Sequence, residues 1–430
     1  MPPGCAPPAF FDGMNLWEEW VVNFLPRFGD SLCRGMSAIG FPEWLMFAAM
    51  GLLAGLVVVT IAALSVPFIV LFERRLLGRL QHRWGPNRVG KFGLLQPIAD
   101  ALKLMVKEDI TPRAADVWVF NLAPLAFAAP VIGVFAVIPW APGAAVADLD
   151  VGALYAVAIS TVGELGVFMA GWASDNRFSL FGAMRSVAML ITYEFPLVLS
   201  VAAVALIAGS LNLSKIVDAQ QTLPLIAFQP LGFLLLVTAI SAELNRPPFD
   251  LMEAESELVT GFHTEYSGMK WAVVQMGEYA GMIAFSLVIA TLLLGGWQGP
   301  LLPGYLWVAL KAMAVISVFV WVRATLPRLR VDQVMALGWK FLLPAAALNL
   351  FLTGAQVLAY PDGLPSWLIP VNCLIALAVI FLGARLLRFR GETRQVIHPG
   401  RQVIAPSDGP RGAAAPATVP TPTATPARSA

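Results

Sequence analysis

The chain has 430 residues, of which 58% are hydrophobic and 13% are charged, and its mean hydropathy is +0.73. These values exclude an ordinary soluble domain and indicate a membrane protein with many spans. The formal net charge of +1 gives no reason to expect a nucleic-acid partner. Three widely separated cysteines and three histidines are too few and too scattered to build an iron–sulfur or metal centre, so we expect none in this chain.

Long apolar runs, each near the ~20 residues that a helix needs to cross hydrocarbon, predict an all-α polytopic membrane protein. Residues 1–40 lack the features of a cleaved signal and contain an interfacial segment at 14–28. Residues 393–430 form an Ala/Pro/Thr-rich tail that we predict to be disordered. Nine runs are the predicted transmembrane helices: about residues 44–72, 117–139, 151–173, 187–208, 228–244, 268–295, 305–325, 339–359 and 366–387.

Residues 96–107 have the pattern of a helix that lies on the membrane surface. Pro97 suits the first turn of a helix, and apolar residues from Leu95 to Met105 recur on one face. The segment is too short to cross the bilayer. We therefore expect an amphipathic helix on the cytoplasmic face.

The distribution of Lys and Arg predicts the topology. Of the 28 such residues, 24 follow helices one, three, five, seven and nine, and three precede the first helix or lie in the opposite loops. Short loops rich in Lys and Arg remain in the cytoplasm. We therefore expect a periplasmic N-terminus, a cytoplasmic C-terminus and a cytoplasmic location for the connection after helix five.

That connection, within residues 242–267, is densely acidic. A charged segment between two apolar helices must be solvated, paired or partly protonated. A solvated loop is the simplest alternative, but neighbouring apolar residues such as Phe262 favour packing against another element. The six carboxylates are Glu243, Asp250, Glu253, Glu255, Glu257 and Glu265.

The same segment predicts a helix break followed by a new helix. Pro247 and Pro248 cannot continue helix five, and Arg246 must reach water or a carboxylate. We predict a helix that starts at Asp250, with Asp250 and Glu253 as a capping pair. Glu257 would then share their face, and Glu255 would point to the other side.

Three further acids lie at membrane depth: Glu164, Glu194 and Glu278. Each alone could be half of a structural ion pair. Together they favour an interior polar path, because ionisable groups in hydrocarbon are costly and usually face such a path. Beside Glu278, Gly277 and Gly281 predict close packing of a neighbouring helix.

An arginine-rich cluster follows the first helix. Topology anchoring and contact with anionic headgroups would explain its arginines. Glu73 differs, since a carboxylate at the membrane boundary beside Arg74 and Arg75 has ready partners and could shape a polar entrance. Residues 85–91 match half of a phosphate-binding loop, but Phe92 replaces the Ser or Thr that would hold Mg²⁺ and no buried strand precedes the loop.

Four long blocks, in this order, resemble the H-subunit family of proton-pumping NADH–quinone oxidoreductase, or respiratory complex I. They are ERRLLGRLQHRWGPNRVGKFGLLQPIADALKLMVKED (73–109), GWASDNRFSLFGAMRSVAMLITYEFPL (171–197), AELNRPPFDLMEAESELVTGFHTEYSG (242–268) and RATLPRLRVDQVMALGWKFLLP (323–344). The resemblance covers about residues 40–360. It implies a membrane component in the bacterial inner membrane, with the mitochondrial inner membrane as the alternative.

The resemblance also implies roles for particular residues. The protein would bind quinone as a substrate and carry no iron–sulfur, flavin or metal centre. It would contact quinone-site subunits of the peripheral arm, antiporter-like subunits of the membrane arm, and lipid. The implied quinone passage contains Glu73, Arg74, Arg83, Arg246 and Phe262. The implied proton and coupling path contains Glu194, Glu243, Asp250, Glu253, Glu255, Glu257, Glu265 and Glu278.

The family core has eight helices, so the chain departs from it at both ends. We expect an interfacial segment at 1–40, the core at 41–360, an extra transmembrane helix at 361–392 and the tail at 393–430. Two alternatives stay open: a homologous membrane subunit of a proton-pumping hydrogenase, and an autonomous secondary transporter. The second normally has repeated halves, and the NRPPFD segment occurs once.

Overall fold

The computed structural model describes residues 42–386 except 254 and 362, and this part of the chain contains helices and no strand. Eight of its helices are long and apolar enough to cross a membrane, which confirms the predicted polytopic α-helical class. The predicted interfacial segment at 14–28 and the tail at 393–430 lie outside the described residues.

Each of the nine predicted transmembrane segments is helical where the structure describes it. Shorter helices connect them, and α6, α11 and α9 supply most of the buried core together with α4 and α5. The long helices are α2 (Glu43–Leu80), α4 (Val117–Val134), α5 (Gly152–Ala173), α6 (Arg177–Ala208), α9 (Pro230–Glu243), α11 (Gly268–Leu293), α12 (Gly304–Thr325), α14 (Leu343–Ala359) and α15 (Leu368–Leu386). The short ones are α3 (Gln96–Val106), α7 (Leu213–Asp218), α8 (Leu225–Phe228), α10 (Glu255–Leu258) and α13 (Val331–Leu337).

Several helices extend beyond their apolar runs. α6 begins at Arg177 rather than near 187, α2 continues past 72 to Leu80, and α13 joins α14 through a π-helical turn, Gly338–Leu342. The fifth segment is instead shorter than its apolar run, because α9 has only 14 residues. Hydropathy marks the part of a helix that contacts lipid, whereas backbone hydrogen bonds continue the helix past that part.

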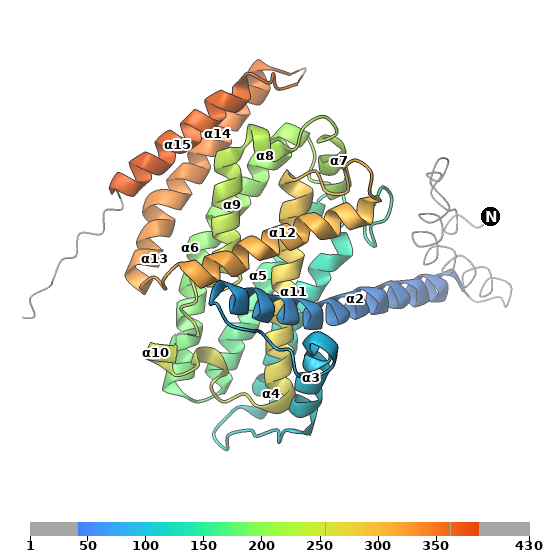
Figure 1. Ribbon diagram of the computed structural model, residues 1–430, viewed down its shortest axis with the longest axis vertical. Coiled ribbons are helices and arrows are strands. Elements are labelled where there is room, and N and C mark those ends of the chain that lie inside the picture. Colours follow the sequence, from blue (N-terminus) through green and yellow to red (C-terminus); the bar gives the residue numbers. More distant parts are fainter. Residues whose placement is uncertain (1–41, 254, 362, 387–430) are drawn as a thin grey trace, which may run out of the picture. The chain divides into compact units, whose positions relative to one another are not determined.

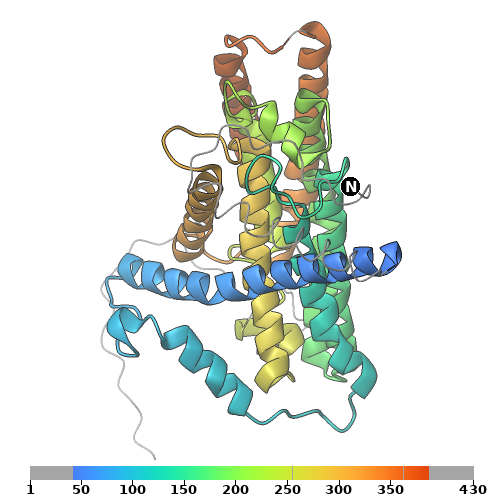
Figure 2. The ribbon, with the colours of Figure 1, turned by 90° about the vertical axis from the view of Figure 1, so that its right-hand side faces the viewer.

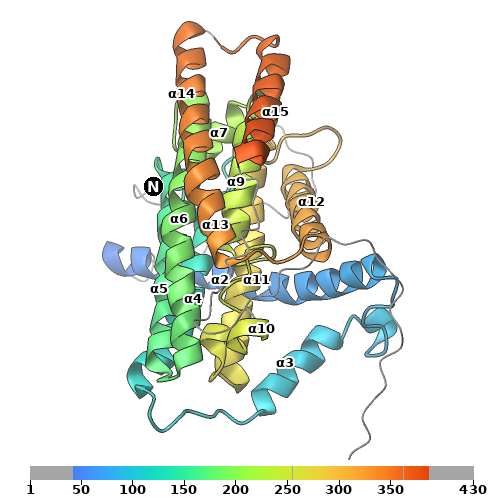
Figure 3. The ribbon, with the colours of Figure 1, turned by 90° about the vertical axis from the view of Figure 1, so that its left-hand side faces the viewer.

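The central packing unit consists of α4, α5, α6 and α11, which run side by side (Figures 1 and 3). Gly277 and Gly281 allow this close approach as predicted, since a Cβ on Gly277 would lie 2.9 Å from the ring of Phe127. α2 instead runs across α11 in all three views, most clearly in Figure 2. α14 and α15 lie together at the end of the unit away from α3 (Figure 3).

The connections after α3, α5, α9 and α12 meet at one end of the bundle, which we call the acidic end. Asp116 N donates to Ala173 O at 3.1 Å, and Asn176 Nδ2 donates to Glu265 Oε1 at 2.6 Å. Lys270 pairs with Asp109 at 3.1 Å. Leu329 N donates to Pro248 O, which adds the connection after α12.

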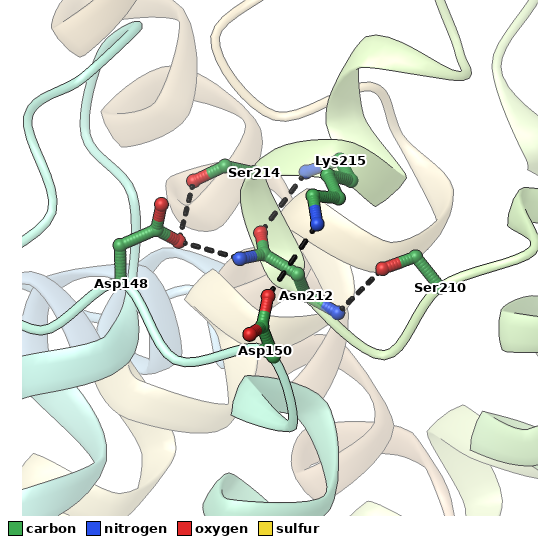
Figure 4. A network of polar contacts seen from close by, with 6 residues as sticks. All are labelled: Asp148, Asp150, Ser210, Asn212, Ser214 and Lys215. Carbon is green, nitrogen blue, oxygen red and sulfur yellow. Dashed lines mark hydrogen bonds and ion pairs between the residues drawn. The ribbon is translucent and has the colours of Figure 1, made fainter.

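The remaining connections meet at the far end. Asn212 caps α7 by accepting from Lys215 N, and its Nδ2 donates to Asp148 Oδ1 at 2.8 Å (Figure 4). Lys215 Nζ also pairs with Asp150. These contacts hold the α4–α5 connection against the start of α7.

Candidate functional site

A buried carboxylate at the acidic end joins three parts of the chain. Glu73, on α2, is 1% exposed. Arg246 Nη1, from the connection after α9, donates to its two carboxylate oxygens at 3.3 and 3.4 Å. Arg323 Nη1, on the last turn of α12, donates to Glu73 Oε1 as well. Glu73 is thus ion-paired, but with Arg246 and Arg323 instead of the sequence neighbours Arg74 and Arg75 that we expected.

Arg246 also contacts the next helix. Its guanidinium carbon lies 4.6 Å from the centre of the Tyr279 ring on α11, a cation–π distance. Its Nη2 is buried and has no hydrogen-bond partner among the residues described. The two neighbouring prolines turn the chain so that this arginine faces inward instead of continuing α9.

The predicted helix from Asp250 is wrong. Residues 250 and 251 are irregular and 252–253 form a turn, and the next α-helical residues described are those of the short α10. Asp250 Oδ2 accepts from Arg328 Nη2 at 2.7 Å, and Leu251 and Met252 are buried. These contacts hold the backbone in a non-helical path, so Asp250, Glu253 and Glu257 do not form one helical stripe.

The turn carries two titratable groups with shifted pKa values. Burial, and next the charge of Glu253, raises the pKa of Asp250, while Arg328 opposes the shift. Burial lowers the pKa of His263, against the attraction of Glu253 and Asp250. The His263 Nδ1 lies 3.7 Å from Glu253 Oε1, too far for a direct hydrogen bond.

Three carboxylates from three helices line one interior cavity. They are Glu164 on α5, Glu243 at the end of α9 and Glu278 on α11, and Ser160 and Asn245 lie beside them. The cavity measures about 30 Å³, enough for one or two water molecules. Two of the intramembrane acids named from the sequence therefore share one small polar space with Glu243.

Hydroxyl and amide groups hold these carboxylates. Ser186 Oγ donates to Glu164 Oε2, and Asn245 Nδ2 donates to Glu164 Oε1 at 3.3 Å. On α5, Ser160 Oγ lies 3.4 Å from Glu243 Oε1. The adjacent Thr161 Oγ1 lies 3.1 Å from Glu194 Oε1, so α5 brings Glu194 to the same row.

Residues 250–253 connect the row of carboxylates with the cluster of Glu73, Arg246 and Arg323. Glu253 lies close enough to Glu278 to interact with it, and Tyr279 is next to Glu278 in the chain. Several buried side-chain atoms here have no partner among the described residues, which is typical of sites that bind water or a ligand. They are Arg246 Nη2, Asp250 Oδ1, Glu253 Oε1, His263 Nδ1 and Glu278 Oε1.

Four other predicted site residues lie nearer the surface of the acidic end: Arg74, Arg83, Glu257 and Glu265. Glu257 pairs with Arg185 at 2.6 Å, and Glu265 accepts from Asn176. Arg74 pairs with Asp100 at 2.6 Å, which attaches α3 to α2. The exposed Arg83 donates to Gln81, Phe262 is buried 6.4 Å from the ring of Phe127, and the Glu255 side chain lies outside the described residues.

Sequence reasoning missed five members of the site: Asn245, His263, Tyr279, Arg323 and Arg328. Both arginines follow the apolar run of α12 on the side counted as basic. That signal places them at the acidic end but does not select Glu73 and Asp250 as their partners. Among the residues described, no group of three His, Cys, Asp or Glu side chains is arranged to hold a metal ion.

Fold and site together define a multi-pass membrane protein with a buried ion cluster beside an interior row of carboxylates. A profile described as NADH dehydrogenase matches residues 53–354. The chain is also 51% identical over 327 residues to an NADH-quinone oxidoreductase H subunit from Dehalococcoides mccartyi, covering 76% of this chain and 92% of the relative. It is 50% identical over 307 residues to an H subunit of the same name, numbered 2, from Geobacter sulfurreducens, covering 69% and 92%.

A third relative, the H subunit from Bacillus cytotoxicus, is 50% identical over 293 residues, with 67% of this chain and 88% of the relative covered. The chain belongs to the NADH dehydrogenase family and, within it, to the H subunits of NADH-quinone oxidoreductase. This membership bears out the resemblance seen in the four blocks and sets aside the autonomous transporter.

Proposed function

We propose that this chain forms the membrane wall of a quinone-reduction site and carries the carboxylates that couple quinone reduction to proton movement. The observation that carries the proposal is the continuity of one polar network. Glu73 and its arginines meet Tyr279 on α11, and the adjacent Glu278 opens onto the cavity with Glu164 and Glu243. A change of charge at one end of this network therefore acts on the other through a medium of low dielectric constant.

The cluster of Glu73, Arg246 and Arg323 is suited to bind the headgroup of a quinone. A quinone carbonyl accepts hydrogen bonds, and Arg246 Nη2 is a buried donor without a partner in the described chain. Negative charge that develops during reduction would be stabilised by Arg246 and Arg323. In this proposal Glu73, Arg74, Arg83, Arg246 and Phe262 line the passage, and neighbouring peripheral-arm subunits supply the electrons.

The carboxylate row suits a proton path. Glu253 and Asp250 lie at its entrance, and Glu278, Glu164 and Glu243 share the cavity. Glu194 on α6 follows, bonded to Thr161 of α5. Buried carboxyl groups hold a proton or release it when a nearby charge changes. Glu257 and Glu265 would deliver protons at the surface, Glu255 would belong to the same path, and antiporter-like subunits would receive the response.

The basic connections give the proposed orientation. The acidic end carries Lys and Arg from the connections after α2, α5, α9 and α12, so it would face the cytoplasm of a bacterial inner membrane. The far end, with the network of Figure 4, would face the periplasm. Quinone would enter laterally from the bilayer.

Coupling is tested with Glu278→Gln in membrane vesicles that contain the whole complex. We expect proton uptake per quinone reduced to fall at least several-fold, because glutamine cannot exchange a proton at this point in the row. The matched control is Glu108→Gln, an exposed acid on the same end of the bundle. An unchanged ratio in Glu278→Gln, Asp250→Asn and Glu255→Gln would contradict the proposed path.

The quinone passage is tested separately with Arg246→Ala. Quinone reduction should fall about 10-fold or more, as for the loss of one electrostatic donor. NADH oxidation by an artificial acceptor, which bypasses the membrane site, should persist. Equal loss of both activities would mean that the complex fails to assemble, and Arg246→Lys, which keeps the charge, would then serve as the test variant.

A further inference from the structure

The start of α9 is a helix break inside the membrane. With 14 residues α9 rises about 21 Å, less than the ~30 Å of the hydrocarbon core. Before it, α8 is a single turn, and Gln229 between them has a non-helical φ of −126° and ψ of 60°. Backbone groups at such a break need partners inside the protein, because lipid offers none.

Hydrogen bonds to three other helices hold this break, and one of them satisfies a backbone carbonyl of the break itself. Gln229 Nε2 donates to Ala203 O on α6 at 3.1 Å and to Thr353 Oγ1 on α14 at 2.9 Å. Asn372 Nδ2 on α15 donates to Phe228 O at 2.7 Å, and Gln356 Nε2 on α14 donates to Asn372 Oδ1 at 2.7 Å. α15 lies beyond the 53–354 range matched by the family, so this last partner comes from the chain's own extension.

Two side-chain atoms in this cluster have no partner among the described residues: Gln229 Oε1, an acceptor, and Asn349 Nδ2, a donor. Their residues are 3% and 6% exposed. Both atoms border the space above Gly232, on the first turn of α9. A Cβ built on Gly232 would lie 2.8 Å from Gln229 Oε1 and 3.1 Å from Asn349 Nδ2.

The two atoms therefore converge on one space beside Gly232. A water oxygen cannot lie at the Cβ position itself, which is about 1.5 Å from Cα, but a water farther out in that space can bond both atoms. A water there accepts from Asn349 and donates to Gln229, so one molecule satisfies both atoms. The cavity lined by Gln229, Asn349, Gln356 and Asn372 measures about 20 Å³, and a bound water requires about 10–15 Å³. Glycine at 232 leaves room for this water, since a Cβ would lie within 3.1 Å of both atoms and displace it.

We propose that one structural water binds between Gln229 and Asn349 over Gly232, and that α15 closes this site against lipid through Asn372. The water links α9 to α14, and Asn372 covers the exposed carbonyl at the break. The extra helix is then a fixed part of the protein that seals a hydrated helix break. This proposal does not depend on the quinone or proton path.

The water is tested by cryo-electron microscopy of the intact complex, at a resolution that shows ordered waters. Wild type should have density between Gln229 and Asn349, and Gly232→Ala should lose it. Gly354→Ala on α14, where an added Cβ meets nothing within 4 Å, is the matched control and should keep the density. A direct Gln229–Asn349 hydrogen bond without water in wild type, or density that persists in Gly232→Ala, would overturn the site.

The role of α15 is tested with Asn372→Leu. The control is Cys373→Leu, because Cys373 is the next residue on α15 and its side chain is exposed. The thermal midpoint for release of this chain from the complex should fall in Asn372→Leu and stay at the wild-type value in Cys373→Leu. Asn372→Ser, which keeps a small polar group, serves if the leucine variant does not assemble. Equal midpoints for the variants at 372 and 373 would overturn the role given to α15.

Discussion

At Glu73 a single carboxylate holds two arginines that arrive from different helices. Glu73 and Arg246 are almost fully buried, whereas the Arg323 side chain is 39% exposed. A buried charge is costly unless it is paired, so each member depends on the others. The sequence places Glu73 at the end of the first helix and Arg246 after the fifth, but nothing in a linear chain states that α2 and α12 converge there.

Removal of the shared carboxylate should therefore destabilise the protein strongly. We expect Glu73→Gln to cost about 3 kcal/mol, because two arginines lose their counter-ion. Asp150→Asn removes one partner of the exposed Lys215 pair and should cost less than about 1 kcal/mol. Thermal unfolding of the purified complex in detergent compares the two, and similar losses would argue against a buried triad.

His263 predicts a particular pH dependence. Its folded-state pKa lies below the ordinary value of 6.5, so beneath pH 6.5 the unfolded chain binds more protons. Stability should therefore be lost as pH falls from 6.5 through the folded pKa. Asp250 has the opposite sign. Its folded pKa is raised above 3.8, so its contribution is lost as pH rises from 3.8 through that folded pKa.

The two effects are separated by His263→Gln. This variant should have a flatter dependence of the thermal midpoint on pH below 6.5, while the contribution of Asp250 remains. Replacement of the exposed His82 by Gln is the control, and it should leave the slope unchanged. A slope in His263→Gln as steep as that of the wild type would refute the assignment.

At the scale of elements, hydropathy predicts which segments are helices far better than where they end. All nine segments are found, yet α6 starts in a charged stretch and a break at Gln229 leaves α9 with only 14 residues. The Asp250 segment failed for a different reason. Its local pattern suits a helix, but the ion pair of Asp250 with Arg328 and the burial of Leu251 and Met252 favour an irregular turn. Such tertiary contacts override local propensity.

The contact between α4 and α5 depends on Gly166. A Cβ there would lie 2.5 Å from Phe127 N, so the two backbones would have to separate. We expect Gly166→Ala to lower stability by about 1–3 kcal/mol, the usual cost of overpacking. Gly55→Ala on α2, where nothing lies within 4 Å, should be neutral or stabilising in the same thermal assay. A neutral Gly166→Ala would mean that the helices adjust freely.

At the scale of the molecule, the connections gather into two ends, and the sequence count of Lys and Arg assigns a side to each. The row of carboxylates could be anticipated in part, because acids in apolar helices are conspicuous. Their order could not, since Glu164, Glu243 and Glu278 become neighbours only through the packing of α5, α9 and α11. Asn245 and Ser186 carry no signal that separates them from other polar residues.

The orientation can be measured with single cysteines in a background where Cys5, Cys33 and Cys373 are serine. Gln221 lies at the far end of the bundle. In intact spheroplasts, a maleimide that cannot cross membranes should therefore label Gln221→Cys. It should label Asn87→Cys, on the basic connection after α2, only after the membrane is opened and the complex denatured. The reverse pattern would invert the topology, and the cysteine-free background controls for labelling of other subunits.

α2 has one further consequence that concerns the bilayer. Its apolar run, about residues 44–72, rises about 44 Å, well above the ~30 Å of hydrocarbon, and a helix with such a mismatch must tilt. It carries Glu73 near its C-terminal end, tied to Arg246 and Arg323. A thicker bilayer would make α2 more upright and pull on that carboxylate. We therefore expect lipid chain length to affect the proposed quinone site mechanically, through one long helix.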